Sequence, residues 1–179
     1  MPESVAIRRA FPSDAQVIAE LHVRSWQWAY RGLLPHEFLS RLSETLDRRI
    51  ERRRANLADE PAEQRTWVAE QAGRVVGFAI TAPSRDTDAA PMTGEVGAIY
   101  LEPDVVGTGI GRMLFAHAVD DLRQRGYQQA TPWVLDRNIR GRKFYEAAGW
   151  TPDGATKTED TQGVQLREVR YRLVLGDRV

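Results

Sequence analysis

Apolar residues recur along the N-terminal segment with two different periods. Residues 5–9 alternate apolar and polar positions, which predicts a short, half-buried strand. Ser13 and Gln16 have the spacing of a capping box, so a helix should begin near Asp14. The inward-facing residues of this helix are expected to be Val17, Ile18, Leu21 and Val23. The segment therefore predicts a strand followed by an amphipathic helix.

The middle of the chain predicts a second helix and then three strands. Gly32 and Pro35 end the first helix, and the pattern over residues 36–57 predicts another. The strands that follow are expected over residues 66–70, 74–81 and 95–101. The turn at residues 71–73 contains a glycine and joins the first two strands as a hairpin.

Strands and helices alternate in the C-terminal half. A helix with an apolar face is expected to run to about Arg125. That face consists of Leu114, Phe115, Ala118, Val119 and Leu122. Residues 130–135 predict a strand, but Pro132 lacks an N–H donor, so this strand should be interrupted or edge-like on one side; a bulge would explain the proline equally. A short helix over residues 138–148 and an alternating strand over residues 166–175 complete the order.

Hairpins first and strand–helix crossovers later are typical of one fold class. We predict an α+β fold of the α/β-sandwich type, with a mixed, mostly antiparallel sheet of about six to seven strands and helices on both faces. With 179 residues, the chain is long enough to bury one core and is expected to form a single domain over 1–179.

Composition narrows the classes of function. Lys and Arg together number 25, as do Asp and Glu, so no global charge attracts nucleic acid or an anionic membrane. No apolar run approaches the roughly 18 to 20 residues that span a bilayer, and no signal peptide is evident, so we expect a cytoplasmic protein. Cysteine is absent and the three histidines are scattered, which argues against a disulfide, a cysteine nucleophile and a metal site.

The basic segment at residues 47–54 can be interpreted in two ways. The sequence DRRIERRR, within the helix expected over residues 36–57, is strongly basic. A solvated helix face explains it, and the balanced charge and lack of interleaved aromatic residues favour that interpretation. The alternative is a patch that binds phosphate or nucleic acid.

The sequence VVGTGIGRML at residues 105–114 indicates an anion site. Glycine lets a ligand approach the backbone, and a helix N-terminus offers unpaired N–H groups to phosphate. A P-loop is excluded because Arg112 and Met113 stand where lysine and a hydroxyl residue are needed. A dinucleotide turn is excluded because Gly111 comes one residue early for that motif.

The wider segment LEPDVVGTGIGRML resembles the acyl-CoA loop of the GNAT superfamily of N-acetyltransferases. Gly109 and Gly111 occupy the two small positions of that motif. The sequence NIRGRKFYEAAGW at residues 138–150 is similar to the second landmark of the superfamily, and IRRAFPSDAQVIAELH resembles its first strand and helix. The resemblance therefore covers most of the chain and implies acetyl-CoA as co-substrate, with no metal.

The resemblance also implies which residues hold the coenzyme. They are Ile99, Tyr100, Leu101, Val106, Gly107, Thr108, Gly109, Ile110, Gly111, Arg112 and Asn138. Val106 departs from the motif, which has Gln or Arg at this position, so contact there is left to the backbone. Asn138 has two explanations, contact with the pantetheine amides and capping of the helix that follows.

The chemistry of amide formation requires a base and an acid. An amine with a pKa near 10 must lose a proton before it attacks, and the departing thiolate must gain one. By resemblance, Tyr145 is the expected acid and Glu95 the expected base; the alternatives are a core aromatic residue and an exposed carboxylate. Because the chain has no cysteine nucleophile, we expect direct transfer within a ternary complex.

The acceptor site is expected at the end of the first helix. Trp26 and Tyr30 share a helix face there and either line the acceptor site or pack in the core. A polar loop over residues 153–163 is the other expected wall. The expected partner is a small-molecule primary amine, and a homodimer is a possible assembly. The alternatives are acetylation of protein N-termini or lysines, and a non-catalytic CoA-binding module.

Overall fold

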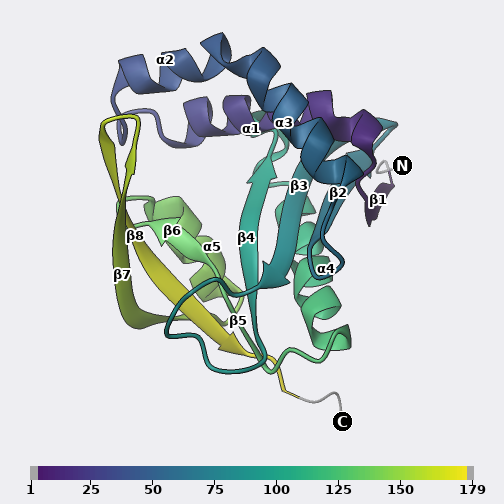
Figure 1. The fold of residues 1–179 in the computed structure, drawn as a ribbon, viewed down its shortest axis with the longest axis vertical. Helices are drawn as coiled ribbons and strands as arrows, with labels where there is room; N and C mark the ends of the chain where they lie inside the picture. Colours follow the sequence, from purple (N-terminus) through teal and green to yellow (C-terminus); the bar gives the residue numbers. More distant parts are fainter. Residues whose placement is uncertain (1–3, 177–179) are drawn as a thin grey trace.

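The computed structural model describes residues 4–176, in which strands and helices follow the expected order (Figure 1). The strands are β1 (Val5–Arg9), β2 (Arg65–Gln71), β3 (Arg74–Pro83), β4 (Thr93–Leu101), β5 (Gln129–Thr131), β6 (Trp133–Leu135), β7 (Thr151–Thr161) and β8 (Val164–Val174). The helices are α1 (Ala15–Ala29), α2 (His36–Glu44), α3 (Leu46–Ala58), α4 (Ile110–Gln124) and α5 (Ile139–Ala147), with 3₁₀ turns at Pro12–Asp14 and Pro103–Val105.

The strands form one mixed sheet, which confirms the predicted fold class. Its order is β1-β2-β3-β4-β5-β8-β6, and β7 pairs with β8. The pairing of β4 with β5 is parallel, and the other pairings are antiparallel. Eight strands are present among the described residues, slightly more than the six to seven expected.

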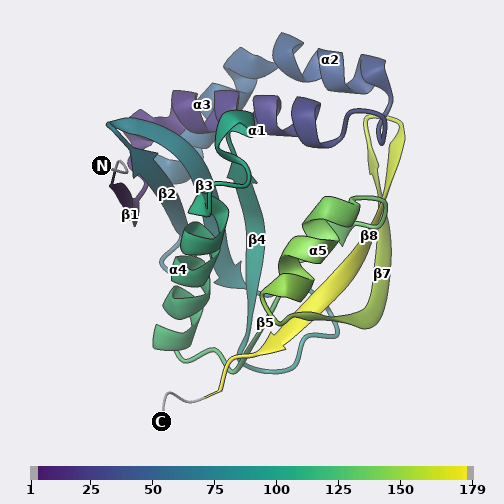
Figure 2. The same cartoon turned by 180° about the vertical axis from the view of Figure 1, so that it is seen from behind.

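The two faces of the sheet pack against different helices (Figures 1 and 2). Successive strand residues point to opposite faces, so Val68 and Phe78 pack against α1 and α3, whereas Ala69 and Ala79 pack against α4. Leu114 and Leu122 of α4, both fully buried, each contribute about 1.5–3 kcal/mol by leaving water. The helices thus cover both faces, as the sequence predicted.

The sheet splits where Pro132 interrupts a strand. The parallel pairing of β4 with β5 ends at Glu95 and Thr131, and beyond Pro132 the chain continues as β6, which pairs only with β8. Figures 1 and 2 show β4 and β8 diverging from β5 toward the end where α1 and α2 lie. The predicted interruption at Pro132 is therefore confirmed, and it separates the two strands that flank the pocket described below.

Three details of the predicted elements were wrong. The helix expected over residues 36–57 is broken at Thr45, where the side-chain hydroxyl donates to the Leu42 carbonyl at 3.2 Å. The break lets α2 and α3 bury their apolar residues in different clusters. Ser13 does not cap α1; instead the Asp14 carboxylate accepts the Phe11 N–H at 2.7 Å and closes a 3₁₀ turn.

The third error concerns residues 153–163, which we expected to be a loop. Most of them belong to β7, which pairs with β8 over its length apart from a register shift between Pro152 and Thr156. The strand is largely exposed, so it has no row of apolar residues from which it could be recognised. The expected lid is therefore one arm of a hairpin.

Candidate active site

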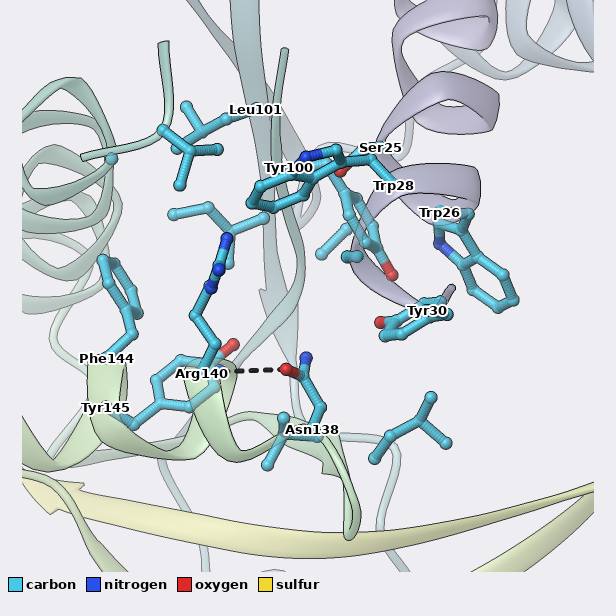
Figure 3. Close-up of a pocket in the computed structure, with 18 of the residues that line it drawn as sticks. Ser25, Trp26, Trp28, Tyr30, Tyr100, Leu101, Asn138, Arg140, Phe144 and Tyr145 are labelled. Carbon is cyan, nitrogen blue, oxygen red and sulfur yellow. Dashed lines mark hydrogen bonds between the residues drawn. The ribbon is translucent and has the colours of Figure 1, made fainter. Parts of the chain in front are cut away.

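A pocket of about 560 Å³ opens where β4 and β6 diverge (Figure 3). The glycine loop lies at one end, β4 and β6 form opposite walls, and residues of α1, α5 and β8 complete the lining. The predicted residues that line it are Trp26, Tyr30, Ile99, Tyr100, Leu101, Val106, Gly107, Thr108, Gly109, Gly111, Arg112, Asn138 and Tyr145. The fold thus brings almost all of the predicted residues to one cavity.

The loop has glycine at its different positions for different structural reasons. Gly107 and Gly109 have φ angles of +88° and +96°, a region that only glycine adopts readily, and a Cβ on either would meet nothing within 4 Å. Gly109 is the N-cap of α4. At Gly111, in contrast, a Cβ would lie 2.8 Å from the Leu101 Cδ1 atom. Gly107 and Gly109 therefore set the loop conformation, and Gly111 lets the helix pack closely on β4.

This loop leaves main-chain donors unpaired. Among the described residues, the N–H groups of Gly107, Gly109, Ile110 and Gly111 have no hydrogen-bond acceptor, whereas those of the residues on either side do. Four free donors at the positive end of a 15-residue helix form a phosphate-binding arrangement. The exposed Arg112 adds a positive charge beside them. The donor set therefore fits the pyrophosphate of a coenzyme.

Two loop residues contribute in other ways. Val106 lines the pocket and is half-buried, so its side chain supplies apolar contact where the superfamily motif has a polar residue. Thr108 donates its hydroxyl to the Val105 carbonyl at 2.7 Å and thereby fixes the turn before the helix. The side chain of Ile110, the first residue of α4, is buried in the core, so only its backbone N–H can reach a ligand.

The wall formed by β4 contains a bulge next to the pocket. Thr81 pairs with Val96 and Ile80 pairs with Ala98, which leaves Gly97 as an extra residue in β4. The unpaired backbone of Gly97 lines the pocket. Farther along, the residues Ile99, Tyr100 and Leu101 pair with β3 on one edge and have no strand on the edge facing the pocket.

Tyr145 occupies a buried position on α5 with its hydroxyl directed to the pocket (Figure 3). Its ring packs against Phe115, Phe144 and Tyr171, at centroid distances of 5.5, 5.6 and 5.7 Å. The hydroxyl forms no hydrogen bond within the described chain. Burial, followed by the charges of neighbouring groups, raises the pKa of Tyr145 well above its usual range, so the phenol is protonated at neutral pH.

Asn138 does cap α5. Its Oδ1 atom accepts the Gly141 N–H at 3.0 Å, as the dashed line in Figure 3 shows. A Cβ on Gly141 would lie 2.6 Å from the Asn138 Nδ2 atom, so this glycine is required for the cap. Because Asn138 also lines the pocket, its amide can serve both roles considered above.

Glu95 is buried at the edge of the pocket. It is 4% exposed, and its Oε1 atom accepts from the Arg85 guanidinium at 3.2 Å. It is not among the lining residues, but its Oε1 atom lies 3.7 Å from where a Cβ on Gly97 would be. The carboxylate therefore reaches the pocket only past the bare backbone of Gly97.

Glu168, which the sequence analysis missed, lines the pocket directly from β8. The side chain is 22% exposed and pairs with Lys157 of β7 at 3.3 Å. Burial raises the pKa of the Glu168 carboxyl; the charge and hydrogen bond of Lys157 oppose this effect, and the charges of Glu159 and Glu95 add to it. The alternating pattern of β8 indicates that Glu168 lies on the polar face of this strand. That face lines the pocket only because β4 diverges from β8, and the sequence does not show this divergence.

Aromatic residues of α1 form the wall opposite α5. The rings of Trp26 and Tyr30 pack edge to face, with their centroids 4.9 Å apart, and both residues line the pocket. Each therefore packs against its neighbour and also forms part of the pocket wall. The Trp26 indole N–H is buried without a partner. Trp28 extends toward α5, where the Arg140 guanidinium lies 4.4 Å from its ring centroid (Figure 3). This contact joins α1 and α5 across the pocket.

Two further features are absent from residues 4–176. No group of three or more His, Cys, Asp or Glu side chains is arranged to hold a metal ion there. Among the same residues, no helix is long and apolar enough to cross a membrane.

Comparison with known proteins identifies the family. The model of the acetyltransferase (GNAT) family matches residues 16–150, so the chain belongs to that family and is an acyltransferase. The uncharacterized N-acetyltransferase YuaI of Bacillus subtilis is 31% identical over 169 residues, which cover 92% of this chain and 90% of that protein.

Solved structures share the fold. The PaiA N-acetyltransferase of Thermoplasma acidophilum, solved with coenzyme A, aligns with a TM-score of 0.67 and 22% identity over 96% of this chain and 99% of that one. The yncA protein of Salmonella typhimurium, solved with acetyl-CoA, aligns with a TM-score of 0.69 and 20% identity over 98% and 96% of the two chains.

Proposed function

We propose that this protein transfers an acetyl group from acetyl-CoA directly to a primary amine of a small molecule, within a ternary complex. The observation that carries the proposal is the continuity of the pocket. One cavity connects the free N–H donors of the glycine loop, the hydroxyl of Tyr145 and the carboxylate of Glu168. Both substrates can therefore meet in one place.

The coenzyme end is formed by main-chain atoms. The loop N–H groups and Arg112 would hold the pyrophosphate, and the unpaired edge of β4 from Gly97 to Leu101 would bind the amide groups of the pantetheine arm. When bound, acetyl-CoA supplies the activated acyl group. The chain provides position, charge and proton transfer.

Tyr145 is proposed as the acid. Its phenol is protonated, is free of protein partners and lines the pocket. It can therefore donate to the departing sulfur, whose parent thiol has a pKa near 8.5. The tight aromatic packing around the ring holds the hydroxyl in place, as a general acid requires.

Two carboxylates can take the proton from the amine. Glu168 faces the cavity, and its raised pKa brings it closer to neutrality, where a general base is most effective. Glu95 would have to act through a water beside Gly97, because Arg85 holds its carboxylate in the wall. We propose Glu168 as the direct base and Glu95 as the residue that acts through water.

The acceptor end favours a compact cationic amine. Trp26 and Tyr30 supply aromatic side chains, which attract ammonium groups, and Glu168 supplies a negative charge. Walls from α1, β6 and β8 border this end. A small molecule therefore suits the site better than an extended peptide.

Free-thiol release from acetyl-CoA is the test. We expect turnover with members of a panel of polyamines, aminoglycosides and amino acids, and none with peptides that present only an N-terminus or a lysine. A companion measurement is the melting temperature, which acetyl-CoA should raise and ATP or NAD should not. Turnover restricted to the peptides would refute the small-molecule acceptor, and no shift at millimolar acetyl-CoA would refute the coenzyme site.

A further inference from the structure

A second cavity lies between α1 and α3, away from the glycine loop. It has a volume of about 230 Å³ and is lined by Ala19, His22, Arg49, Arg52, Arg53 and Asn56. The four α3 residues follow the spacing i, i+3, i+4, i+7, which places them on one face of the helix. Apolar residues usually fill such a seam between packed helices. Here the small side chain of Ala19 leaves space, and three arginines border it.

These positive charges have no negative partner. In the chain from residue 4 to 176, none of the three arginines forms an ion pair with a carboxylate: the Nε of Arg49 donates to the Thr45 hydroxyl at 3.0 Å, and the guanidinium of Arg53 lies 5.3 Å from the Phe78 ring centroid. By contrast, Arg54 on the same helix pairs with Glu51. Burial and then neighbouring arginines lower the pKa of both Arg49 and Arg53; for Arg53 the charge of Glu60 opposes this effect without forming an ion pair.

His22 adds an independent observation at the base of the cavity. Its Nε2 atom is buried and has no hydrogen-bond partner, an arrangement that is rare for buried polar atoms. The ring is held between Phe78 and Tyr100, with centroids 5.7 and 4.5 Å away. Burial and the charges of the three arginines lower the pKa of His22 to about 3. An anion in the cavity would offset the charge effect of the arginines on this ring.

Guanidinium groups are suited to one ligand chemistry in particular. Their planar forks donate in pairs to phosphate oxygens and carry a full charge at every physiological pH. A solvated helix face would explain an exposed Arg52. It does not explain why the half-buried Arg49 and Arg53 border a cavity that His22 also lines.

We propose that the cavity between α1 and α3 binds a small phosphate-bearing anion, held by the forks of Arg49, Arg52 and Arg53 beside the ring of His22. This site is distinct from the coenzyme loop and does not depend on the proposed acyl transfer. It lies behind the acceptor pocket, because the ring of Tyr100 is stacked on His22 and also lines that pocket.

The test compares thermal unfolding with and without inorganic phosphate at constant ionic strength. Saturating phosphate, at about 100 times its Kd, should raise the Tm of the parent protein by about 5 °C or more. The double variant Arg49→Gln/Arg52→Gln should lose this shift, and its Tm without phosphate should rise because like charges no longer repel each other. Arg54→Gln removes one charge from the same helix outside the cavity and should keep the phosphate shift.

NMR of the histidine rings supplies a second measurement. The chain has three histidines, and phosphate should move the signal of His22 but not that of His117, which packs against Trp67 on the opposite face of the sheet. An equal phosphate shift in the double variant and the parent would place the anion elsewhere, at the glycine loop for example. That result, or an unmoved His22 signal, would overturn the proposal.

Discussion

Replacing either Tyr145 or Tyr171 with phenylalanine makes it possible to separate an effect on catalysis from an effect on stability. Their rings are 5.7 Å apart, and both are buried. The Tyr145 hydroxyl has no partner in the described chain and lines the pocket. The Tyr171 hydroxyl instead donates to the Glu146 carboxylate at 2.7 Å and accepts from the Arg142 Nε at 3.1 Å. Phenylalanine at either position keeps the ring and removes only the hydroxyl.

The expected effects differ in kind. Tyr145→Phe removes the proposed acid, and such a loss lowers kcat by about 10²–10⁴, or about 3–5 kcal/mol in the activation free energy. Its stability should change by less than about 0.5 kcal/mol, because no hydrogen bond within the protein is lost. Tyr171→Phe removes two hydrogen bonds at about 0.5–1.5 kcal/mol each. Its Tm should fall by about 2–12 °C while kcat remains within about twofold of the parent.

The assays are thiol release under saturating acetyl-CoA and thermal unfolding of both variants. The reasoning about Tyr145 is refuted if its variant turns over at the parent rate, or if it loses turnover only together with a large fall in Tm. Coenzyme affinity should be unchanged in both variants, because neither hydroxyl is among the groups proposed to hold the pyrophosphate or the pantetheine arm. A loss of affinity in Tyr145→Phe would indicate a binding role in place of the acid role.

Three further predictions concern the walls of the pocket. Burial raises the pKa of Glu168, and a base must be deprotonated, so kcat/KM should fall as the pH drops through that raised pKa. Glu168→Gln should abolish this step in the pH–rate profile, whereas Glu95→Gln should retain it. Gly111→Ala should destabilise the fold by about 1–3 kcal/mol in denaturant unfolding, because its Cβ would lie 2.8 Å from Leu101 Cδ1. Val106→Arg should tighten coenzyme binding by calorimetry or leave it unchanged; a large loss would mean that the loop does not bind phosphate.

The sequence was informative wherever local rules determine the structure. The alternation of apolar residues predicted the core strands, and the loss of the N–H group at Pro132 predicted the break between β5 and β6. The glycine spacing predicted the loop before α4. These features depend on a residue and its near neighbours along the chain, so no knowledge of tertiary contacts was needed.

The features that the sequence did not show depend on contacts between distant segments. Glu168 belongs to the pocket only because β8 crosses from β5 to β6, a path that no pattern in residues 166–175 encodes. The strand β7 lies at the exposed edge of a hairpin, so it lacks an apolar face. The break at Thr45 follows from the separate clusters that α2 and α3 join. In each case tertiary packing decided the outcome.

Two backbone irregularities at the same level of the sheet create the site. Glu95 and Thr131 form the last parallel pair of β4 and β5. The bulge at Gly97 lies two residues after Glu95. Pro132 follows Thr131 directly and has no N–H group to donate to a neighbouring strand. The two strands therefore stop bonding to each other at one point, and their facing backbone groups become available to a ligand. In the proposed complex, a coenzyme bound along this opened edge would have its phosphates at the N-terminus of α4, which follows β4 after one 3₁₀ turn, and its other end beside Tyr145. In this proposal the position of the acyl group follows from where the sheet stops pairing, and Tyr145 and Glu168 would move protons there.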